Sequence, residues 1–234
     1  MENFYKRITE LIKNKESQPR TLSAMSSVLQ KPNDKEDRII YDVYRGVENV
    51  KNLRYDLTFI YPETLGKEFS KTYGHYHKKG GIEIMGVVKG KIQWLFQKYE
   101  NNPKIITEVY LVEANEKEST IFLPGFGIIS INPTKKETIL SNWLSLDLES
   151  DYQSYTELHG ACYYALENGE FIKNPNYDEV PELIKLKPRE IPELGITFNK
   201  PIYDLKDTPE KLDFLNNPEK YKNILTLENC FTKI

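Results

Sequence analysis

Histidine and cysteine are both scarce in this chain, which has 3 histidines and 2 cysteines among 234 residues. Cys162 and Cys230 lie far apart and lack the short spacing of a cysteine-rich metal site. This scarcity excludes a disulfide framework and a zinc-finger arrangement. We therefore expect both cysteines to be reduced thiols in a cytoplasmic protein.

Long apolar runs and an excess of positive charge are also missing. No segment approaches the ~18 apolar residues that a membrane span requires. The first residues, MENFYKRITELIKNKES, contain no apolar core of a secretory signal. Lysine and arginine total 32 against 35 acidic residues, which gives a net charge of -3. A basic stripe for nucleic acid is thus absent, and we expect neither a membrane nor a nucleic acid as partner.

Short runs rich in β-branched and aromatic residues fill the region from about residue 38 to residue 172. Turn residues separate them, and Gly90 between two such runs predicts a tight turn. Ile92, Trp94 and Phe96 alternate along one run and should share one face. This pattern predicts an all-β protein, a sandwich or a barrel. The runs include RIIYDVYRGV, YDLTFIY, IEIMGVV, KIQWLF, TEVYLVEA, STIFLP, GIISIN and TILSNWLSL.

The two ends of the chain differ from this middle region. Apolar residues at helical spacing, among them Ile8 and Leu11, predict a short amphipathic helix near the N-terminus. Prolines punctuate the chain after residue 174 and disfavour long regular elements there. We expect three parts: an N-terminal helix (1–19), a barrel (20–174) and a proline-rich C-terminal extension packed on the barrel or on a partner subunit (175–234).

Two of the three histidines occur together in the stretch KTYGHYHKKGGIE, residues 71–83. In a strand, His75 and His77 would point to one face and Tyr76 to the other. Two neutral imidazoles side by side can bind one metal ion. The alternative is a solvent-exposed turn that carries two surface histidines.

A carboxylate follows this pair, because Glu83 comes six residues after His77. Gly80 and Gly81 give the backbone the freedom to return Glu83 to the face of the histidines. Two imidazoles and one carboxylate form a facial set that leaves positions open for substrate, and it suits a divalent Fe, Mn, Ni or Zn ion. His159, the third histidine, is a possible fourth ligand, although a surface loop position is favoured.

The motif H-x-H-x5-E-x6-G, from His75 to Gly90, resembles the first cupin motif. The stretch GKEFSKTYGHYH, residues 66–77, resembles the signature of the cupin-type glucose-6-phosphate isomerases of archaea and bacteria. The similarity covers roughly residues 20–175. It implies a cupin fold, a double-stranded β-helix or jelly-roll barrel, and a homodimer that interconverts glucose 6-phosphate and fructose 6-phosphate.

The resemblance also implies roles for individual residues. His75, His77 and Glu83 match the metal ligands of the family, and Glu83 also matches its catalytic carboxylate. The remaining matches concern the sugar phosphate, for which Lys71 is a further candidate cation. Residues that match its binding site are Thr58, Thr72 and Gly74 at the phosphate end, and Tyr152.

Three positions depart from the family pattern. Ile128 stands where the second cupin motif carries a metal-binding histidine, Met85 replaces a pocket tyrosine, and Ser150 replaces a histidine. Two hypotheses follow: a working isomerase with a three-ligand metal site, or a non-catalytic or divergent cupin that binds a sugar or sugar phosphate. An open facial site also leaves room for another metal-dependent reaction, such as oxygen chemistry.

Overall fold

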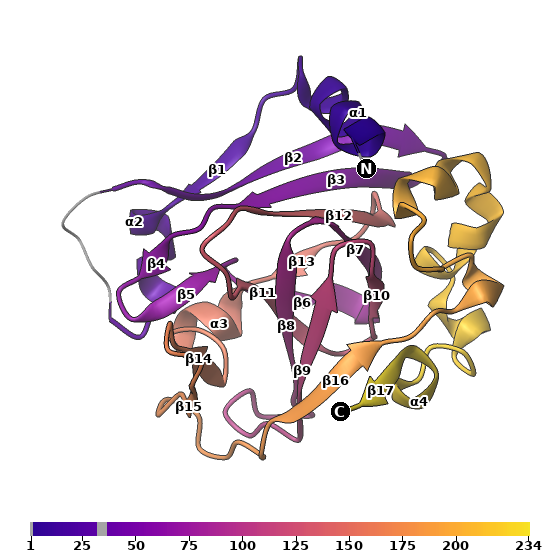
Figure 1. Ribbon diagram of the computed structural model, residues 1–234. Helices are drawn as coiled ribbons and strands as arrows, with labels where there is room; N and C mark the ends of the chain where they lie inside the picture. The colour runs from indigo at the N-terminus through magenta and orange to yellow at the C-terminus, as the bar shows by residue number, and fades with distance from the viewer. Residues whose placement is uncertain (1, 32–36) are drawn as a thin grey trace.

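Two β-sheets that pack against each other form the body of the protein in the computed structural model, which describes residues 2–31 and 37–234 (Figure 1). The prediction of an all-β protein is therefore confirmed. Every strand pair in the two sheets is antiparallel except one. The first sheet has, in spatial order, β1 (Gln18–Thr21), β2 (Ile39–Val50), β3 (Leu53–Ile60), β12 (Thr138–Ser145), β7 (Glu83–Lys89) and β10 (Ser119–Phe122).

The second sheet includes strands from the C-terminal part of the chain. Its order is β17 (Phe231–Lys233), β16 (Ile184–Pro188), β9 (Glu108–Asn115), β8 (Lys91–Lys98), β11 (Gly127–Asn132), β5 (Glu68–Lys71) and β4 (Thr64–Leu65). Two short pairs complete the strands: β6 (Tyr76–His77) with β13 (Ser150–Asp151), and β14 (Tyr163–Ala165) with β15 (Phe171–Lys173).

Helices are short and lie at the margins of the sheets (Figure 1). The α-helices are α1 (Glu2–Ile12), α2 (Leu22–Met25), α3 (Gln153–Glu157) and α4 (Leu227–Cys230). The 3₁₀ helices are η1 (Ser26–Val28), η2 (Lys78–Gly80), η3 (Pro192–Leu194), η4 (Ile202–Asp207), η5 (Pro209–Leu215) and η6 (Pro218–Tyr221). In the described part of the chain, no helix has both the length and the apolar character to cross a membrane.

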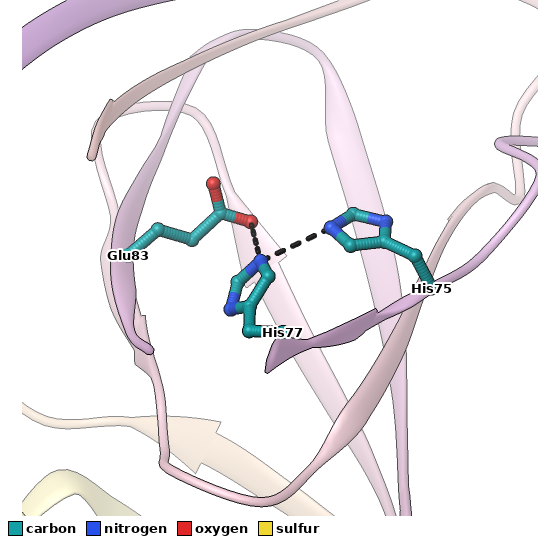
Figure 2. Close-up of side chains that lie close together, drawn as sticks. All are labelled: His75, His77 and Glu83. Atoms are coloured by element: carbon teal, nitrogen blue, oxygen red, sulfur yellow. Dashed lines mark hydrogen bonds and ion pairs between the residues drawn. The ribbon is translucent and has the colours of Figure 1, made fainter. Parts of the chain in front are cut away.

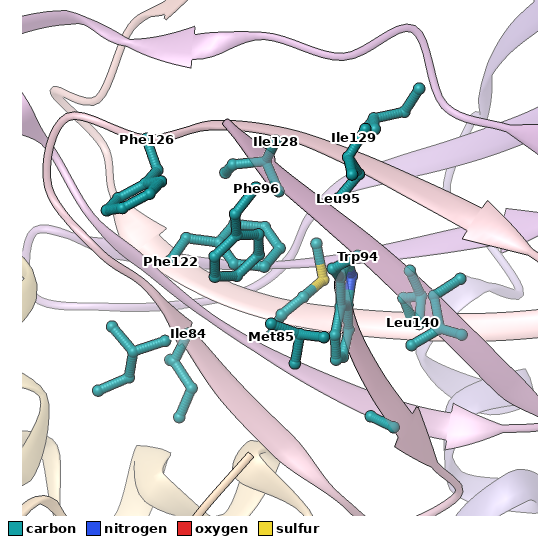
Figure 3. Close-up of a cluster of buried hydrophobic side chains, with 14 of the residues drawn as sticks. Ile84, Met85, Trp94, Leu95, Phe96, Phe122, Phe126, Ile128, Ile129 and Leu140 are labelled. Atoms are coloured by element: carbon teal, nitrogen blue, oxygen red, sulfur yellow. The ribbon is translucent and has the colours of Figure 1, made fainter. Parts of the chain in front are cut away.

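Aromatic and aliphatic side chains pack together in the core of the barrel (Figure 3). Phe122 of β10 meets Phe96 of β8 at 5.2 Å and Trp94 at 5.9 Å between ring centroids. Trp94 and Phe96 therefore share a face, as their alternation predicts. The turn at Gly90, with φ +88°, joins β7 and β8 across this core, so it is a corner between sheets and not the end of a hairpin.

The strand β12 is buried along its whole length. An antiparallel strand often has one face exposed to solvent, so both faces of β12 must be covered. Its outer face is covered by the C-terminal extension. The Trp143 indole N–H donates a hydrogen bond of 2.8 Å to the Ile202 carbonyl. Tyr55 of β3 packs between Trp143 and Tyr203, at 5.0 and 5.1 Å between ring centroids. The extension thus forms a third layer on this side of the barrel.

We expect Trp143→Ala to lower the free energy of unfolding by about 3–5 kcal/mol, because it empties a fully buried site. Urea denaturation measures this loss. Leu146→Ala is the matched control, since Leu146 is 46% exposed and should change stability by less than about 0.5 kcal/mol. Equal losses in the two variants would contradict the third layer.

Candidate functional site

Backbone pairing holds the two histidines in position. His75 and Ile128 exchange two hydrogen bonds, of 3.0 Å from the His75 N–H and 2.9 Å from the Ile128 N–H. His77 pairs with Ser150 through β6 and β13. The two imidazole rings lie 4.9 Å apart between centroids and share one face. The geometry expected from an extended segment is therefore present, although only Tyr76–His77 is a regular strand.

Tyr76 points to the opposite face and anchors the segment there. Its ring lies 5.6 Å from that of Tyr155, and its hydroxyl accepts a hydrogen bond of 3.1 Å from Gln97. A Cβ atom at Gly127 would lie 2.5 Å from the Tyr76 ring. The Tyr76 ring therefore packs directly against Gly127, where a residue with a side chain would not fit.

Gly74 precedes the histidine pair with φ +86°, in the left-handed region that favours glycine. A Cβ atom there would lie 2.5 Å from Tyr155 Cε1. Both the backbone conformation and the close aromatic contact therefore exclude a larger side chain. The resulting bend directs His75 into the space between the sheets.

A tight turn brings Glu83 back to the histidines. The turn is η2, in which Gly80 has φ +66°. The Gly81 carbonyl accepts a hydrogen bond of 3.1 Å from His77 Nδ1. Because a carbonyl can only accept, Nδ1 carries the proton and the lone pair of Nε2 points into the site.

The three polar side chains converge between the sheets, as Figure 2 shows. His75 Nε2 lies 3.1 Å from His77 Nε2, and His77 Nε2 lies 3.6 Å from Glu83 Oε1. Their ligand atoms all fall within 4.8 Å of one another. Glu83 Oε2 accepts a hydrogen bond of 2.9 Å from the Asn142 amide.

Burial controls the protonation of this group. It lowers the pKa of His75 to about 3 and that of His77 to about 4, so both rings are neutral near pH 7. Burial raises the pKa of Glu83 to about 8, against the opposing effect of the Asn142 hydrogen bond. Without a cation the site therefore contains two neutral imidazoles and a carboxyl group that keeps its proton.

These residues fit a divalent metal ion. Two imidazole nitrogens, each about 2.1 Å from one ion and at right angles, would lie about 3.0 Å apart, and those of His75 and His77 lie 3.1 Å apart. The tautomer of His77 and the Asn142 bond to Glu83 resemble the outer contacts that orient metal ligands. A His75, His77 and Glu83 group could thus hold a metal.

A cavity of about 90 Å³ opens onto this group. A larger cavity, of about 570 Å³, lies over the outer face of β7, and none of the predicted site residues lines it. The smaller one is the candidate site because the chemically active side chains face it. The predicted substrate residues that line it are Thr58, Thr72, Gly74 and Tyr152.

Two other candidates lie elsewhere. Lys71 is buried and forms an ion pair with Glu68, so it is neither a phosphate ligand in this cavity nor a surface lysine. Its ammonium group also lies over the Tyr164 ring, 5.4 Å from the centroid. His159 is exposed on a loop and has φ +55°, so it is not a fourth ligand.

The positions that depart from the family pattern all face the cavity. Ile128, Met85 and Ser150 line it. Ile128 is 2% exposed and lies beside His75 through their backbone pairing. An isoleucine has no donor atom for a metal, so the wall next to His75 is apolar.

The cavity also contains charged residues that sequence reasoning missed, namely Arg45, Arg54 and Asp56. The period of a strand could have found two of them, since residues 54, 56 and 58 share one face with the predicted Thr58. Asn142 gave no such signal, because its contact with Glu83 depends on the register between β12 and β7.

Comparison with known proteins identifies the family. The family model described as Glucose-6-phosphate isomerase (GPI) matches residues 14–182. This chain belongs to the cupin-type glucose-6-phosphate isomerase family. Proteins named Glucose-6-phosphate isomerase include one from Pyrococcus abyssi, which is 30% identical over 149 residues, or 61% of this chain and 75% of that protein. Another, from Thermococcus litoralis, is 27% identical over 178 residues, or 72% of this chain and 90% of that protein.

Solved structures similar to this family member include other cupin-like proteins. A W96F oxalate decarboxylase from B. subtilis aligns with a TM-score of 0.37 at 8% identity, over 60% of this chain and 28% of that one. The 7S globulin of Momordica charantia aligns with a TM-score of 0.38 at 11% identity, over 59% of this chain and 35% of that one. Scores this low carry no conclusion about function.

We expect Gly74→Ala to destabilise the protein more than Gly169→Ala. Both glycines have positive φ, of +86° and +88°, but only a Cβ at Gly74 meets another atom within 4 Å. Backbone strain should cost each variant about 1–2 kcal/mol, and the Tyr155 contact should add about 1–3 kcal/mol at Gly74 alone. Thermal denaturation of both variants measures the difference; equal losses would refute the tight contact.

We expect metal affinity to rise with pH between about 6 and 8, because Glu83 must lose its proton to bind a cation. The two histidines are already neutral there, so about one proton is released per ion below pH 8 and fewer above it. Calorimetry with Mn²⁺ or Zn²⁺ in buffers of different ionisation enthalpy counts the protons.

Glu83→Gln is the matched control for this titration. It should bind metal weakly and with little dependence on pH. His75→Ala should also remove bound metal. Proton release that persists in Glu83→Gln, or full metal retention in His75→Ala by elemental analysis, would reject the assigned ligands.

Proposed function

We propose that this protein is a metal-dependent aldose–ketose isomerase that interconverts glucose 6-phosphate and fructose 6-phosphate. One observation carries the proposal: His75, His77 and Glu83 converge at a cavity inside the barrel of a glucose-6-phosphate isomerase family member. In this proposal the protein is an intramolecular oxidoreductase, and its substrate is a sugar phosphate.

His75, His77 and Glu83 would hold a divalent Fe, Mn, Ni or Zn ion. When bound, such an ion supplies polarisation of the substrate carbonyl and orients the neighbouring hydroxyl group. The tautomer of His77, fixed by the Gly81 carbonyl, keeps a lone pair available for this purpose.

Glu83 is the proposed catalytic residue. Isomerisation by proton transfer needs a group that takes a proton from one of two adjacent carbons and returns a proton to the other. The alternative route, a hydride shift between the two carbons, depends less on such a base. Once a cation has displaced its proton, the buried Glu83 carboxylate could accept a proton from the substrate and return it. The Asn142 amide holds one carboxyl oxygen and leaves the other directed toward the histidines.

Thr58, Thr72, Gly74 and Tyr152 are the proposed substrate-binding residues. Thr58 and Thr72 offer hydroxyl groups, and Thr72 Oγ1 also accepts a hydrogen bond of 3.0 Å from the Ser130 N–H. The Tyr152 ring lies 5.5 Å from His75 and 5.6 Å from Tyr73, between centroids. It would pack beside the sugar at the metal ligands and restrict water there.

A second candidate function is a divergent cupin that binds a sugar or sugar phosphate without turning it over. Ile128 favours it, because an apolar side chain lines the cavity next to His75. A metal held by three protein ligands would then depend on water to complete its coordination. The two functions differ in turnover and not in binding.

The proposal includes a homodimer, which rests on the family alone. Light scattering of the purified protein determines its mass in solution against the 27.4 kDa of one chain.

We expect the metal-depleted protein to convert fructose 6-phosphate only after Fe²⁺, Mn²⁺, Ni²⁺ or Zn²⁺ is added back. A coupled assay for glucose 6-phosphate measures the rate. Glu83→Gln should lower kcat by about 100-fold or more even at a metal concentration that saturates the variant, since general acid–base catalysis contributes about 10²–10⁴-fold. Measurable sugar-phosphate binding without turnover for any metal would favour the binding module instead.

Ile128→His is the companion variant, since it places an imidazole beside His75. We expect it to tighten metal binding. An unchanged metal affinity in a folded variant would contradict the position of Ile128 at the metal ligands.

A further inference from the structure

A second polar cluster lines the same cavity, at the end formed by β2 and β3. It consists of Arg45, Arg54 and Asp56. Arg54 Nε lies 3.1 Å from Asp56 Oδ2, and Arg45 Nη1 lies 3.5 Å from the same oxygen. Two guanidinium groups therefore share one carboxylate, which leaves one positive charge in excess.

An irregularity in β2 builds this cluster. The register between β2 and β3 shifts between Tyr44 and Glu48, so Arg45 lies in a bulge. Gly46, with φ +58°, donates its N–H to Asp56 Oδ1 at 2.7 Å. Bulges commonly redirect side chains near active sites. Here the bulge places the Arg45 side chain beside the buried Asp56.

The arginines keep donors free for a ligand. Arg54 uses Nε for Asp56, and Arg45 uses Nε for Gln18 at 2.9 Å. In the described residues, the Nη2 atoms of both arginines and Nη1 of Arg54 make no hydrogen bond. Their side chains are 39% and 21% exposed, whereas that of Asp56 is 2% exposed. Solvent or a ligand can therefore reach the cationic side chains but hardly the carboxylate.

The cluster lies beside one of the predicted substrate-binding residues. Asp56 and Thr58 are successive residues on one face of β3, about 6.6 Å apart along the strand. Thr58 and Thr72 offer hydroxyl groups but no charge. Arg45 and Arg54 are the fixed cationic side chains among the described residues that line the cavity. Arg20 lies over the Tyr73 ring, 5.5 Å from its centroid, and is not part of the lining.

We infer that Arg45 and Arg54 form an anion subsite that binds the phosphate group of the substrate, together with the Thr58 hydroxyl. Guanidinium forks match the geometry of phosphate oxygens and bind them with charge-assisted hydrogen bonds. Asp56 pairs with both guanidinium groups and so holds them in place. It also competes with a phosphate for these groups, which limits how tightly a free anion binds. This inference rests on the proposed function, because it takes a sugar phosphate as the substrate.

Calorimetric titration of the full-length, metal-depleted protein with inorganic phosphate tests the subsite without requiring catalysis. We expect Arg45→Gln and Arg54→Gln each to weaken phosphate binding by about 10-fold or more, the usual loss of a charge-assisted contact. Asp56→Asn should tighten it several-fold, because the competing charge disappears. Arg38→Gln is the matched control, since Arg38 pairs with Glu63 outside the cavity, and it should bind phosphate as the parent protein does.

The arginine variants and Asp56→Asn are expected to change phosphate affinity in opposite directions. Misfolding would lower the affinity in every variant, so it cannot produce this pattern. Phosphate affinity that is undetectable at millimolar concentration, or unchanged in both arginine variants, would overturn the subsite. The subsite would also be overturned if Arg20→Gln or Thr72→Ala weakened phosphate binding while the variants of Arg45 and Arg54 did not. Turnover of fructose 6-phosphate with unchanged phosphate binding in the arginine variants would refute the subsite alone. Arginine-dependent phosphate binding without turnover would refute the isomerase alone.

Discussion

Burial of a carboxyl group beside two imidazoles is the constraint on which this site depends. Glu83 is 3% exposed, and Asn142 is its one hydrogen-bond partner among the described side chains. An ionised carboxylate in such a place is costly without a counter-charge, which is why burial raises its pKa to about 8. The same burial keeps the rings of His75 and His77 neutral. A divalent cation would offset the cost of the buried carboxylate and would bind the lone pairs of the neutral rings, so the barrel disfavours the charged carboxylate until a cation is bound.

The fold places these groups by means that are mostly local. Gly74 bends the chain, Tyr76 anchors it on the far side, and η2 returns Glu83. Asn142 comes from β12, which is paired with both β3 and β7 in the middle of the first sheet. The positions of these side chains therefore depend on two features: glycine conformations within one short stretch, and strand register across the sheet.

Features that depend on local sequence pattern could be predicted from the sequence. Contacts between segments that are distant in the sequence could not. The strands, the facing of Trp94 and Phe96, and the shared face of His75 and His77 all follow from the period of a strand. The corner at Gly90 could not be told from a hairpin, because the turn residue is the same for both. Lys71 was misassigned because its partner Glu68 is buried by tertiary packing. Arg45 was missed because a bulge in β2 sets its direction, whereas Arg54 lies on a regular strand and could have been found from its shared face with Thr58. Roles for Thr58, Thr72, Gly74 and Tyr152 stay predictions, although all four line the cavity.

The covering of β12 by the C-terminal extension has a consequence for how the protein is made. Trp143 and its acceptor Ile202 are 59 residues apart in sequence. On the ribosome, the strand that carries Asn142 therefore emerges well before the segment that seals its outer face. Domains fold in the order of synthesis only as far as their contacts are available. The strand that carries Asn142 therefore gains its outer cover only after the C-terminal extension has been synthesised.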